Sequence, residues 1–493
     1  MTVGRRLSDL GLAARGGRDP LVAGLAVDSR AVRPGFLFAA LPGHRAHGAD
    51  FVPAALEMGA GAVLTDAEGA ARAAGALAEA GAALVVAGDA REALARAAAL
   101  WSGLQPATVV AVTGTNGKTS VATFARRIWA ILGHRAINIG TTGVEGDWTA
   151  PTSHTTPDPV ALHAMLAEAA RAGVTHAAME ASSHGLDQRR LDGVRLAAAG
   201  FTNFSQDHLD YHGTFEAYFE AKAALFGRVL PPGGAAVVNM DDPRGAAMAA
   251  VAEGRGQRVV AVGTARGCDL RIAGQRFDAT GQDLRLDWRG GVHQARLALV
   301  GGFQGANVAL AAALCIASGS DPARVMAALP GLRGVRGRMQ LAATRANGAA
   351  VYVDYAHTPD AVATALRALR PHVLGRIVVI LGAGGDRDRG KRPLMGRAAA
   401  ANADAVYVTD DNPRTEDPAA IRAAILAGCP GAIEVGDRAE AILRGVGALG
   451  PGDALLIAGK GHETGQTIGA QVFPFDDAEQ ASIAVAALDG VRA

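Results

Sequence analysis

Cysteine is scarce in this sequence, which has only three among its 493 residues. Cys268, Cys315 and Cys429 lie far apart and show none of the close spacings that mark zinc sites. This spacing excludes a structural zinc site of the usual kind. The simplest expectation is that all three are small buried hydrophobic residues in a protein of a reducing compartment.

Long apolar runs and an excess of charge of one sign are also absent. The longest apolar stretch, Ala306–Ala317, has about 12 residues, whereas a membrane-spanning helix needs roughly 20. Met1–Leu12 carries charges and lacks the apolar centre of a signal peptide. The formal net charge of +1 gives no indication of a nucleic-acid partner. We expect a soluble cytoplasmic monomer with small-molecule substrates, and neither nucleic acid nor membrane as a partner.

The length and the apolar content predict several globular domains. Apolar residues make up 49% of the chain, and 493 residues exceed one ordinary core. Residue patterns divide the chain into three α/β domains, at 1–104, 105–337 and 338–493. In the first two domains the predicted strands are Gly35–Ala40, Ala62–Thr65, Ala83–Ala87, Thr108–Thr113, Val174–Glu180 and Ala235–Asn239. Residues 254–300 alternate more, which predicts a further β-rich segment.

The C-terminal domain is predicted to be Rossmann-like, with a parallel sheet whose strands all end in polar clusters. The expected strands are Ala350–Val353, Ile377–Leu381, Ala405–Thr409 and Ala454–Ala458. The clusters that follow them are Asp354–His357, Gly384–Arg389, Asp410–Arg414 and Gly459–Glu463. Because ligands bind beyond the carboxyl ends of strands in open α/β sheets, these clusters predict one polar crevice.

A glycine-rich loop between a strand and a helix predicts a phosphate site in a central, P-loop-type parallel-sheet domain. Thr113-Gly-Thr-Asn-Gly-Lys-Thr119 directly follows the β-branched run Thr108–Thr113. The loop N–H groups and the helix N-terminus would hold an anion, Lys118 would reach the β- and γ-phosphates, and Thr119 would bind Mg²⁺. The match to the usual phosphate-loop pattern is imperfect, since Val112 stands where the first glycine is expected. An ordinary glycine-rich turn is the alternative.

Several other polar residues allow both a functional and an ordinary interpretation. Glu180 ends a strand and suits Mg²⁺, which prefers oxygen ligands, whereas a solvated loop explains His208 equally well. Lys222 lies in an amphipathic helix, and the residues alone favour a surface lysine. Arg414, with Arg387 in the same crevice, favours a ligand that carries a carboxylate, and a capped turn with a surface arginine is the alternative.

Five motifs resemble, in the same order, those of the Mur ligases, which build the peptide of bacterial cell-wall precursors. They are Thr113–Thr119, Met179–Leu186, Asp207–His212, Val353–Asp360 and Gly459–Glu463, and the set spans almost the whole chain. The resemblance implies one domain each for a UDP-sugar, for ATP and for an incoming amino acid. It also implies that ATP phosphorylates the D-Glu side-chain carboxylate of UDP-N-acetylmuramoyl-L-alanyl-D-glutamate. The amine of the amino acid then attacks the acyl phosphate, and ADP and phosphate leave.

The resemblance also assigns residues to each site. For ATP they are Gly114, Thr115, Asn116, Gly117, Lys118, Thr119 and Ser120, with Asn307, Arg338 and Asp354 around adenine and ribose. For the UDP-sugar they are Ser29, His44, Arg45, Ala46, Thr155, Thr156, Ser182, Gln188 and Arg190. The Mg²⁺ ligands would be Thr119, Glu180, His208 and Lys222, the last as a carbamate. Lys118, Lys222 and His208 would be catalytic, which reverses the surface interpretation of Lys222.

The amino acid that is added follows, by the same resemblance, from Asp411-Asn412-Pro413-Arg414. Family members that add meso-diaminopimelate carry this sequence here, whereas those that add L-lysine usually carry another. Arg414 and Arg387 would bind the distal carboxylate, which lysine lacks, and an unpaired buried arginine would reject lysine strongly. Gly459 and Glu463 would complete the pocket, with Glu463 at the distal amine.

Two positions depart from the family pattern, and three alternatives stay open. Gln304 stands where the family commonly has Asn, and Gln340 where an acid is common, which puts details of adenine binding in doubt. A family member that adds L-lysine is the first alternative. The second is folylpolyglutamate synthase, which has a similar ATP loop but no UDP-sugar domain. The third is a nucleotide-binding switch without ligase chemistry.

Overall fold

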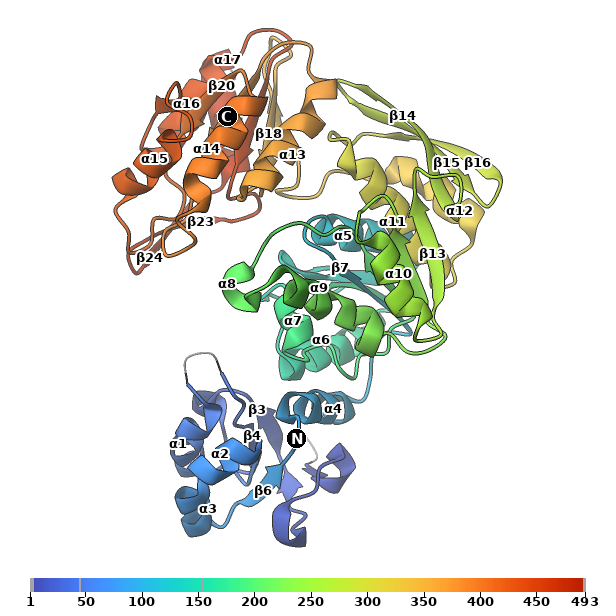
Figure 1. Ribbon diagram of the computed structural model, residues 1–493, viewed down its shortest axis with the longest axis vertical. Coiled ribbons are helices and arrows are strands. Elements are labelled where there is room, and N and C mark those ends of the chain that lie inside the picture. The colour runs from blue at the N-terminus through green and yellow to red at the C-terminus, as the bar shows by residue number, and fades with distance from the viewer. Residues whose placement is uncertain (1–3, 44–45, 153, 491–493) are drawn as a thin grey trace.

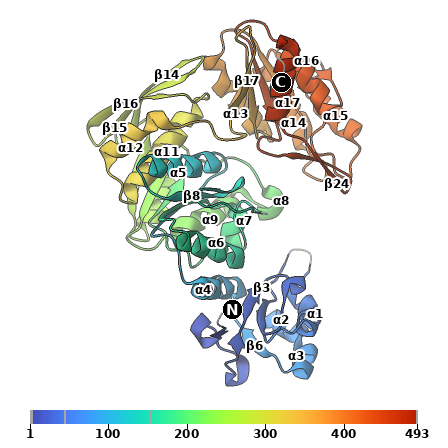
Figure 2. The ribbon, with the colours of Figure 1, turned by 180° about the vertical axis from the view of Figure 1, so that it is seen from behind.

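The protein folds into three α/β bodies that follow one another along the chain (Figure 1). The computed structural model describes residues 4–43, 46–152 and 154–490. Each body has its own open sheet with helices packed on it, and the N-terminal body is set apart from the other two in both views (Figure 1 and Figure 2). No helix in these described ranges is long and apolar enough to cross a membrane.

The first sheet has four parallel strands in the spatial order β3-β4-β5-β6. This body consists of β3 (Gly24–Ala26), β4 (Phe36–Ala39), β5 (Ala62–Thr65), β6 (Ala83–Val86), α1 (Val52–Glu57), α2 (Ala67–Arg72), α3 (Ala74–Ala80) and α4 (Ala90–Ser102). A short antiparallel pair, β1 (Arg5–Arg6) and β2 (Leu21–Val22), precedes them. Helix α4 packs against α6 (Pro159–Arg171) and so joins this body to the next.

The middle sheet has ten strands in the order β16-β15-β14-β13-β12-β11-β7-β10-β8-β9. They are β7 (Thr108–Thr113), β8 (Ala136–Gly140), β9 (Gly143–Gly146), β10 (His176–Glu180), β11 (Ala198–Phe201), β12 (Ala235–Asn239), β13 (Arg258–Gly263), β14 (Leu270–Asp278), β15 (Gly281–Trp288) and β16 (Gly291–Leu297). Strands from β8 across to β14 pair in parallel, whereas β9, β15 and β16 are antiparallel to their neighbours. The predicted β-rich segment 254–300 is therefore confirmed as a continuation of this sheet.

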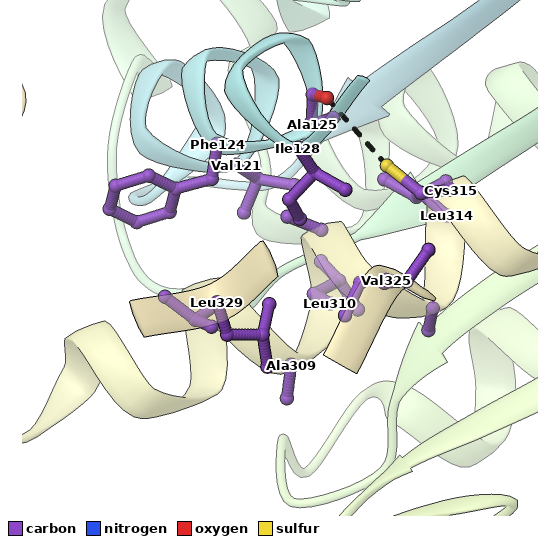
Figure 3. Packing of buried hydrophobic residues seen from close by; sticks show 14 of the residues in the cluster. Val121, Phe124, Ala125, Ile128, Ala309, Leu310, Leu314, Cys315, Val325 and Leu329 are labelled. Carbon is purple, nitrogen blue, oxygen red and sulfur yellow. Dashed lines mark hydrogen bonds between the residues drawn. The ribbon is translucent and has the colours of Figure 1, made fainter. Parts of the chain in front are cut away.

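Strand β7 lies inside the middle sheet because it is apolar on both faces. Val110 and Val112 belong to the core formed with α5 (Lys118–Ile131) and α11 (Phe303–Ala317), which Figure 3 shows. Val109 and Ala111 belong to the core on the opposite face. A β-branched run covered by helices on both sides is typical of a buried parallel strand. The remaining helices of this body are α7 (Ser183–Asp187), α8 (Leu209–His212), α9 (Phe215–Ala224), α10 (Gly245–Glu253) and α12 (Pro322–Ala328).

The C-terminal sheet has six strands in the order β17-β18-β22-β19-β20-β21, parallel except for the edge strand β17. They are β17 (Gln340–Thr344), β18 (Ala350–Asp354), β19 (Ile377–Leu381), β20 (Ala405–Val408), β21 (Ile433–Glu434) and β22 (Ala454–Ala458). One face is covered by α13 (Pro359–Leu369), α14 (Lys391–Asn402) and α15 (Pro418–Leu426), the other by α16 (Arg438–Gly447) and α17 (Asp477–Asp489). A hairpin of β23 (Gly465–Ile468) and β24 (Gln471–Pro474) projects from this body.

A buried histidine joins the C-terminal body to the middle one. Gly301 N donates to His372 Nε2 at 3.1 Å, and His372 Nδ1 donates to Asp278 O at 2.7 Å. One ring nitrogen accepts and the other donates, which is the neutral form of imidazole. Burial also lowers the pKa of His372, in agreement with this form.

The predicted strands all occur, with ends that differ by at most two residues from those expected. The sequence missed β8, β9 and β11 of the ten-stranded sheet, and elsewhere it missed β1, β2, β3, β17, β21, β23 and β24. Strand β11 reads Ala-Ala-Gly-Phe and has no β-branched residue, so only its neighbours make it a strand. Cys315 and Cys429 are buried as predicted, but Cys268 is only partly buried, so the prediction was wrong for that residue.

We predict that Leu310→Ala destabilises the middle body. Leu310 is 2% exposed and packs in the core between α5 and α11 (Figure 3). Truncation leaves a cavity in a close-packed core and is expected to cost about 2–5 kcal/mol. A thermal unfolding scan should show a lower Tm, whereas Leu374→Ala, at a side chain that is 95% exposed, should leave it unchanged. An unchanged Tm for Leu310→Ala would contradict this packing.

Candidate active site

The glycine-rich loop connects β7 to α5, and two of its glycines adopt backbone conformations that other residues resist. Gly114 has a φ of 145°, and a Cβ there would overlap Thr202 Oγ1. Gly117 has a φ of 86°, and a Cβ there would lie 2.6 Å from Asn307 Oδ1. Both φ values lie in the region that favours glycine, so the chain needs glycine to follow this path.

The residues after β11 hold the loop in place. Thr115 N donates to Asn203 O at 2.9 Å, and Asn116 N donates to Asn203 Oδ1 at 2.9 Å. Thr202 Oγ1 donates to Asn116 O at 2.6 Å. The loop is thus fixed between the ends of two parallel strands, where its other N–H groups and the N-terminus of α5 favour an anion.

Two lysine side chains end at the same carbonyl oxygen of this loop. Lys118 Nζ donates to Gly114 O and Thr115 O, both at 2.8 Å, and Lys222 Nζ donates to Gly114 O at 2.7 Å. Lys222 is 1% exposed, so the surface interpretation drawn from its helix was wrong. Burial, and then the charge of Lys118, lower the pKa of Lys222 well below its usual value, against the opposing effect of Asp207. The space around Gly114 O therefore favours a negatively charged group.

A buried carboxylate accepts hydrogen bonds from the first turn of α5 and from the residue after β8. Thr119 Oγ1 donates to Glu180 Oε2 at 3.0 Å, and Thr141 N donates to Glu180 Oε1 at 2.8 Å. Thr141 Oγ1 also donates to Glu180 Oε2, at 3.2 Å. These oxygen atoms are of the kind that Mg²⁺ prefers. The sequence missed Thr141 because it missed β8; a polar residue after that strand would have been the signal.

His208 lies near both lysines, and its surroundings favour the neutral ring. It has a φ of 52°, and its Nε2 lies 3.4 Å from Asp207 Oδ2. Burial is the main cause that lowers the pKa of His208, and Lys118 and Lys222 lower it further, against the effect of Asp207. A neutral imidazole offers a lone pair to a metal ion. No group of three or more His, Cys, Asp or Glu residues in the described ranges is arranged to hold one.

A cavity of about 520 Å³ lies between the middle and C-terminal bodies. Residues from three of the predicted sites line it, namely Thr115, Asn116, Gly117, Lys118, Thr119, Ser120, Thr155, Glu180, Ser182, His208, Asn307, Arg338 and Asp354. The structure thus brings the phosphate loop together with residues about 190 to 240 positions further along the chain.

Arg338 bridges the two bodies across this cavity. Its Nη2 donates to Thr119 Oγ1 at 3.2 Å, and its guanidinium group lies 4.5 Å from the centre of the Tyr355 ring. Asp354 Oδ2 accepts from Met339 N at 2.7 Å, which fixes the backbone next to Arg338. Burial raises the pKa of Asp354, and the charge of Arg338 lowers it.

The two residues that depart from the family pattern both form hydrogen bonds beside this cavity. Gln304 Oε1 accepts from Asn307 Nδ2 at 3.3 Å, and Gln340 Oε1 accepts from Gly337 N at 2.8 Å. Gln304 therefore supports Asn307, which is a predicted nucleotide contact. Gln340 supports Gly337, which adjoins the predicted contact Arg338.

Four residues predicted for the UDP-sugar form one chain of hydrogen bonds beside Glu180. Thr156 Oγ1 donates to Glu180 O at 2.9 Å and accepts from Ser182 N at 3.0 Å. Arg190 Nη1 donates to Thr156 O at 2.6 Å, and Arg190 Nη2 donates to Gln188 Oε1 at 2.8 Å. These polar groups hold each other in place next to the carboxylate.

The other residues predicted for the UDP-sugar are spread over two bodies. Thr155 lines the cavity. Ser29 begins a 3-10 turn of the first body, Ala46 is exposed there, and neither is among the described residues that line the cavity. His44 and Arg45 lie outside the described residues.

The predicted arginine pair surrounds a glycine after β19. A Cβ on Gly384 would lie 2.8 Å from Arg414 Nη1 and 3.8 Å from Arg387 Cγ. Arg414 Nη1 donates to Gly385 O at 2.6 Å, and Arg414 has the left-handed φ of 51°. The loops after β19 and β20 therefore bring Arg387, which is exposed, and the guanidinium group of Arg414 to one end of the sheet.

The acidic residues predicted for the amino-acid site, Asp411 and Glu463, lie in the loops after β20 and β22. A Cβ on Gly459 would lie 2.6 Å from Asp411 Oδ2, so glycine permits this approach. Asn412 Nδ2 donates to Glu463 Oε2 at 2.8 Å. Pro413 O lies so close to Gly385 that a Cβ there would overlap it. Residues predicted to bind the amino acid thus meet at the carboxyl ends of three strands.

Three family models match this chain. They are described as the Mur ligase family, catalytic domain (residues 21–102), the Mur ligase middle domain (112–315) and the Mur ligase, glutamate ligase domain (337–461). The UDP-N-acetylmuramoyl-L-alanyl-D-glutamate--2,6-diaminopimelate ligase of Caulobacter vibrioides is 50% identical over 99% of this chain and 100% of its own length. The ligase of that name from Bradyrhizobium diazoefficiens is 52% identical, over 94% of this chain and 95% of its own. A solved structure of a ligase with that name is 35% identical, covers 99% of both chains and has a TM-score of 0.70.

We predict that Gly114→Ala abolishes nucleotide binding. The added Cβ would overlap Thr202 Oγ1 in a backbone conformation that alanine resists, so the loop must move. Calorimetric titration with ATP should show no measurable affinity. Gly75→Ala, at a position in α3 with no heavy atom near the added Cβ, should bind like the unaltered protein. Equal affinities for the two variants would contradict the loop geometry.

Proposed function

The chain belongs to the Mur ligase family, and on this premise we propose that it joins meso-diaminopimelate to UDP-N-acetylmuramoyl-L-alanyl-D-glutamate in a reaction driven by ATP. The observation that carries the proposal is that relatives about half identical to this chain over nearly its whole length bear the name of this ligase. The match at residues 21–102 disfavours folylpolyglutamate synthase, which has no UDP-sugar domain.

In the proposed reaction the γ-phosphoryl group of ATP passes to the side-chain carboxylate of the D-glutamyl residue. The bond from the γ-phosphorus to the bridging oxygen breaks, a bond to the carboxylate oxygen forms, and ADP leaves. The amine of diaminopimelate then attacks the carbonyl carbon of the acyl phosphate, an amide bond forms, and phosphate and a proton leave. Such transfers depend on positioning and positive charge more than on covalent catalysis by the protein.

Lys118 is the proposed contact of the β- and γ-phosphates. Its ammonium group donates to two loop carbonyls in the structure, and phosphate oxygens would replace these acceptors when ATP binds. The loop N–H groups and the N-terminus of α5 would hold the rest of the polyphosphate. Asn307, Arg338 and Asp354 line the same cavity and would surround adenine and ribose.

The proposed Mg²⁺ ligands are Thr119, Glu180, His208 and Lys222 as a carbamate. The donor chemistry fits, because the oxygens of Thr119 and Glu180 are buried and 3.0 Å apart. When bound, Mg²⁺ neutralises charge on the phosphate oxygens.

Carbamylation of Lys222 would give this site its missing anion. Burial and the charge of Lys118 lower the pKa of Lys222, so the neutral amine is favoured. The neutral nitrogen attacks the carbon of CO₂, an N–C bond forms, and a proton leaves. The product replaces the Lys222 amine at Gly114 O by an anion.

Each of the three domains takes one part of the substrates in this proposal. Residues 1–104 bind the UDP moiety, through Ser29, His44, Arg45 and Ala46. Residues 105–337 bind ATP and the sugar dipeptide, the latter through Thr155, Thr156, Ser182, Gln188 and Arg190. Residues 338–493 bind diaminopimelate. The hydrogen-bonded chain from Arg190 to the backbone oxygen of Glu180 supports the second assignment, because the side chain of Glu180 in turn accepts from Thr119 of the phosphate loop.

Diaminopimelate would be recognised by opposite charges at the ends of three strands. Arg414 and Arg387, close together around Gly384, would pair with the distal carboxylate. Glu463 would take the distal amine, while Gly459 and Asp411–Pro413 shape the pocket. L-Lysine offers the amine but no distal carboxylate, so it would leave the arginines unpaired.

We predict that the purified protein ligates meso-diaminopimelate and discriminates strongly against L-lysine. With ATP, Mg²⁺ and the UDP-muramoyl dipeptide, kcat/KM for lysine should be lower by about 100-fold or more. Phosphate release and mass spectrometry of the product measure this. Turnover with lysine and none with diaminopimelate would overturn the assignment. Phosphate release from ATP alone, unaffected by the sugar nucleotide, would indicate a nucleotide switch.

We predict that Lys222→Ala lowers kcat by about 100-fold or more, since an anionic ligand is lost where phosphoryl charge must be neutralised. Short-chain carboxylates should restore part of the activity by occupying the vacated space. Lys222→Arg keeps the positive charge but cannot be carbamylated, so it should be equally inactive and not be rescued. Full activity of either variant would remove a Lys222 carbamate from the reaction.

A further inference from the structure

One buried charged residue lies among the proposed diaminopimelate contacts without a role in the sites above. Lys460, in the loop after β22, is 0% exposed. A buried ammonium group is strongly unfavourable unless it is paired and hydrogen-bonded. The role of Lys460 can therefore be inferred from the groups that accept hydrogen bonds from its ammonium group.

The ammonium group of Lys460 joins its own loop, at Glu463 and at the start of the hairpin, to the loop after β20. Its Nζ donates to Asn412 Oδ1 at 3.1 Å, to Glu463 Oε2 at 3.2 Å and to Gly465 O at 2.6 Å. An ammonium group has three N–H donors, and these three acceptors match their number. Asn412 follows β20, Glu463 follows β22, and Gly465 is the first residue of the β23–β24 hairpin.

Asn412 closes these contacts into a ring. Its Nδ2 donates to Glu463 Oε2 at 2.8 Å, and its Oδ1 also accepts from Thr467 N at 2.9 Å. Two donors on Oδ1 and a carboxylate at Nδ2 fix the orientation of this amide. Glu463 Oε2 is engaged by both Lys460 and Asn412, whereas Oε1 has no hydrogen bond within the described ranges. That second oxygen is the one available to a ligand amine.

The β23–β24 hairpin, whose first residue accepts a hydrogen bond from Lys460, also forms hydrogen bonds with the backbone of Arg414. Arg414 N donates to Thr467 O at 3.1 Å, and Gly469 N donates to Arg414 O at 2.7 Å. Arg414 has a φ of 51°, which a residue other than glycine keeps only when its surroundings hold it. The hairpin projects from the C-terminal body on the side where α8 lies (Figure 1 and Figure 2). Lys460 is thus connected both to the Glu463 carboxylate and, through the hairpin, to the backbone of Arg414.

We propose that Lys460 is a positioning residue that sets the spacing between Glu463 and Arg414, and through it the preference for a diamino acid with a distal carboxylate. It touches no substrate in this scheme. It fixes the acceptor for the distal amine relative to the donor for the distal carboxylate. The inference rests on the proposed function, because these two roles do.

The experiment is steady-state ligation by full-length Lys460→Met. The variant keeps the length of the side chain and removes its three donors. The KM for meso-diaminopimelate should rise about tenfold or more, because Glu463 and Asn412 lose a charged partner. The KM values for ATP and for the UDP-muramoyl dipeptide should not change. The ratio of kcat/KM for diaminopimelate to that for L-lysine should fall.

Arg345→Met is the matched control. Arg345 is a largely buried cation of the same body that pairs with Asp489 at 2.6 Å, on the last turn of α17. Its loss should lower the Tm without changing the KM for diaminopimelate. Lys460→Gln keeps amide donors without the charge, should show a smaller rise in this KM, and serves if Lys460→Met does not fold.

Two results would overturn the proposal. One is a KM for diaminopimelate in the Lys460 variants equal to that of Arg345→Met. The other is an equal rise in KM for all three substrates, which indicates general loosening of the domain. The proposed function and the role of Lys460 are refuted by different results. If the unaltered protein does not ligate diaminopimelate, the proposed function fails. If it does and the variants match it, only the role of Lys460 fails.

Discussion

Two buried lysine amines that share one carbonyl oxygen are the constraint on which the rest of the site depends. Lys118 and Lys222 both donate to Gly114 O. Two ammonium groups this close would repel strongly where water is excluded, which is one reason why the pKa of Lys222 is lowered. The space around Gly114 O therefore favours a negatively charged group. Gly114, whose φ of 145° other residues resist, makes the approach possible.

The groups around that carbonyl are distant in sequence but come from adjacent strands. Strands β8, β10, β7 and β11 lie side by side and run parallel, so their carboxyl ends form one edge. Thr141, Glu180 and Asn203 lie at or just after the ends of three of these strands, and the phosphate loop follows the fourth. The site is therefore a consequence of strand order as much as of residue type.

The C-terminal sheet places its polar clusters in the same way, at the carboxyl ends of its strands, and a backbone contact joins one of these clusters to the residue before Arg338. A Cβ on Gly337 would overlap His462 N, so these two chains pass in direct contact. Arg338, which reaches Thr119 Oγ1, follows one of these residues, and Glu463, which Lys460 holds, follows the other. The segments that carry Arg338 and Glu463 are therefore in direct backbone contact.

The sequence by itself determined the strands with β-branched or aliphatic runs, the phosphate loop and the polar clusters after the strands of the C-terminal sheet, because those features depend on local patterns. It did not determine β11, whose small residues have weak strand preference, or the burial of Lys222. That amine meets its acceptor 108 residues away, and Lys460 meets Asn412 48 residues away. Only the tertiary structure decided these contacts, since the free energy of a buried charge depends on partners that no local pattern specifies.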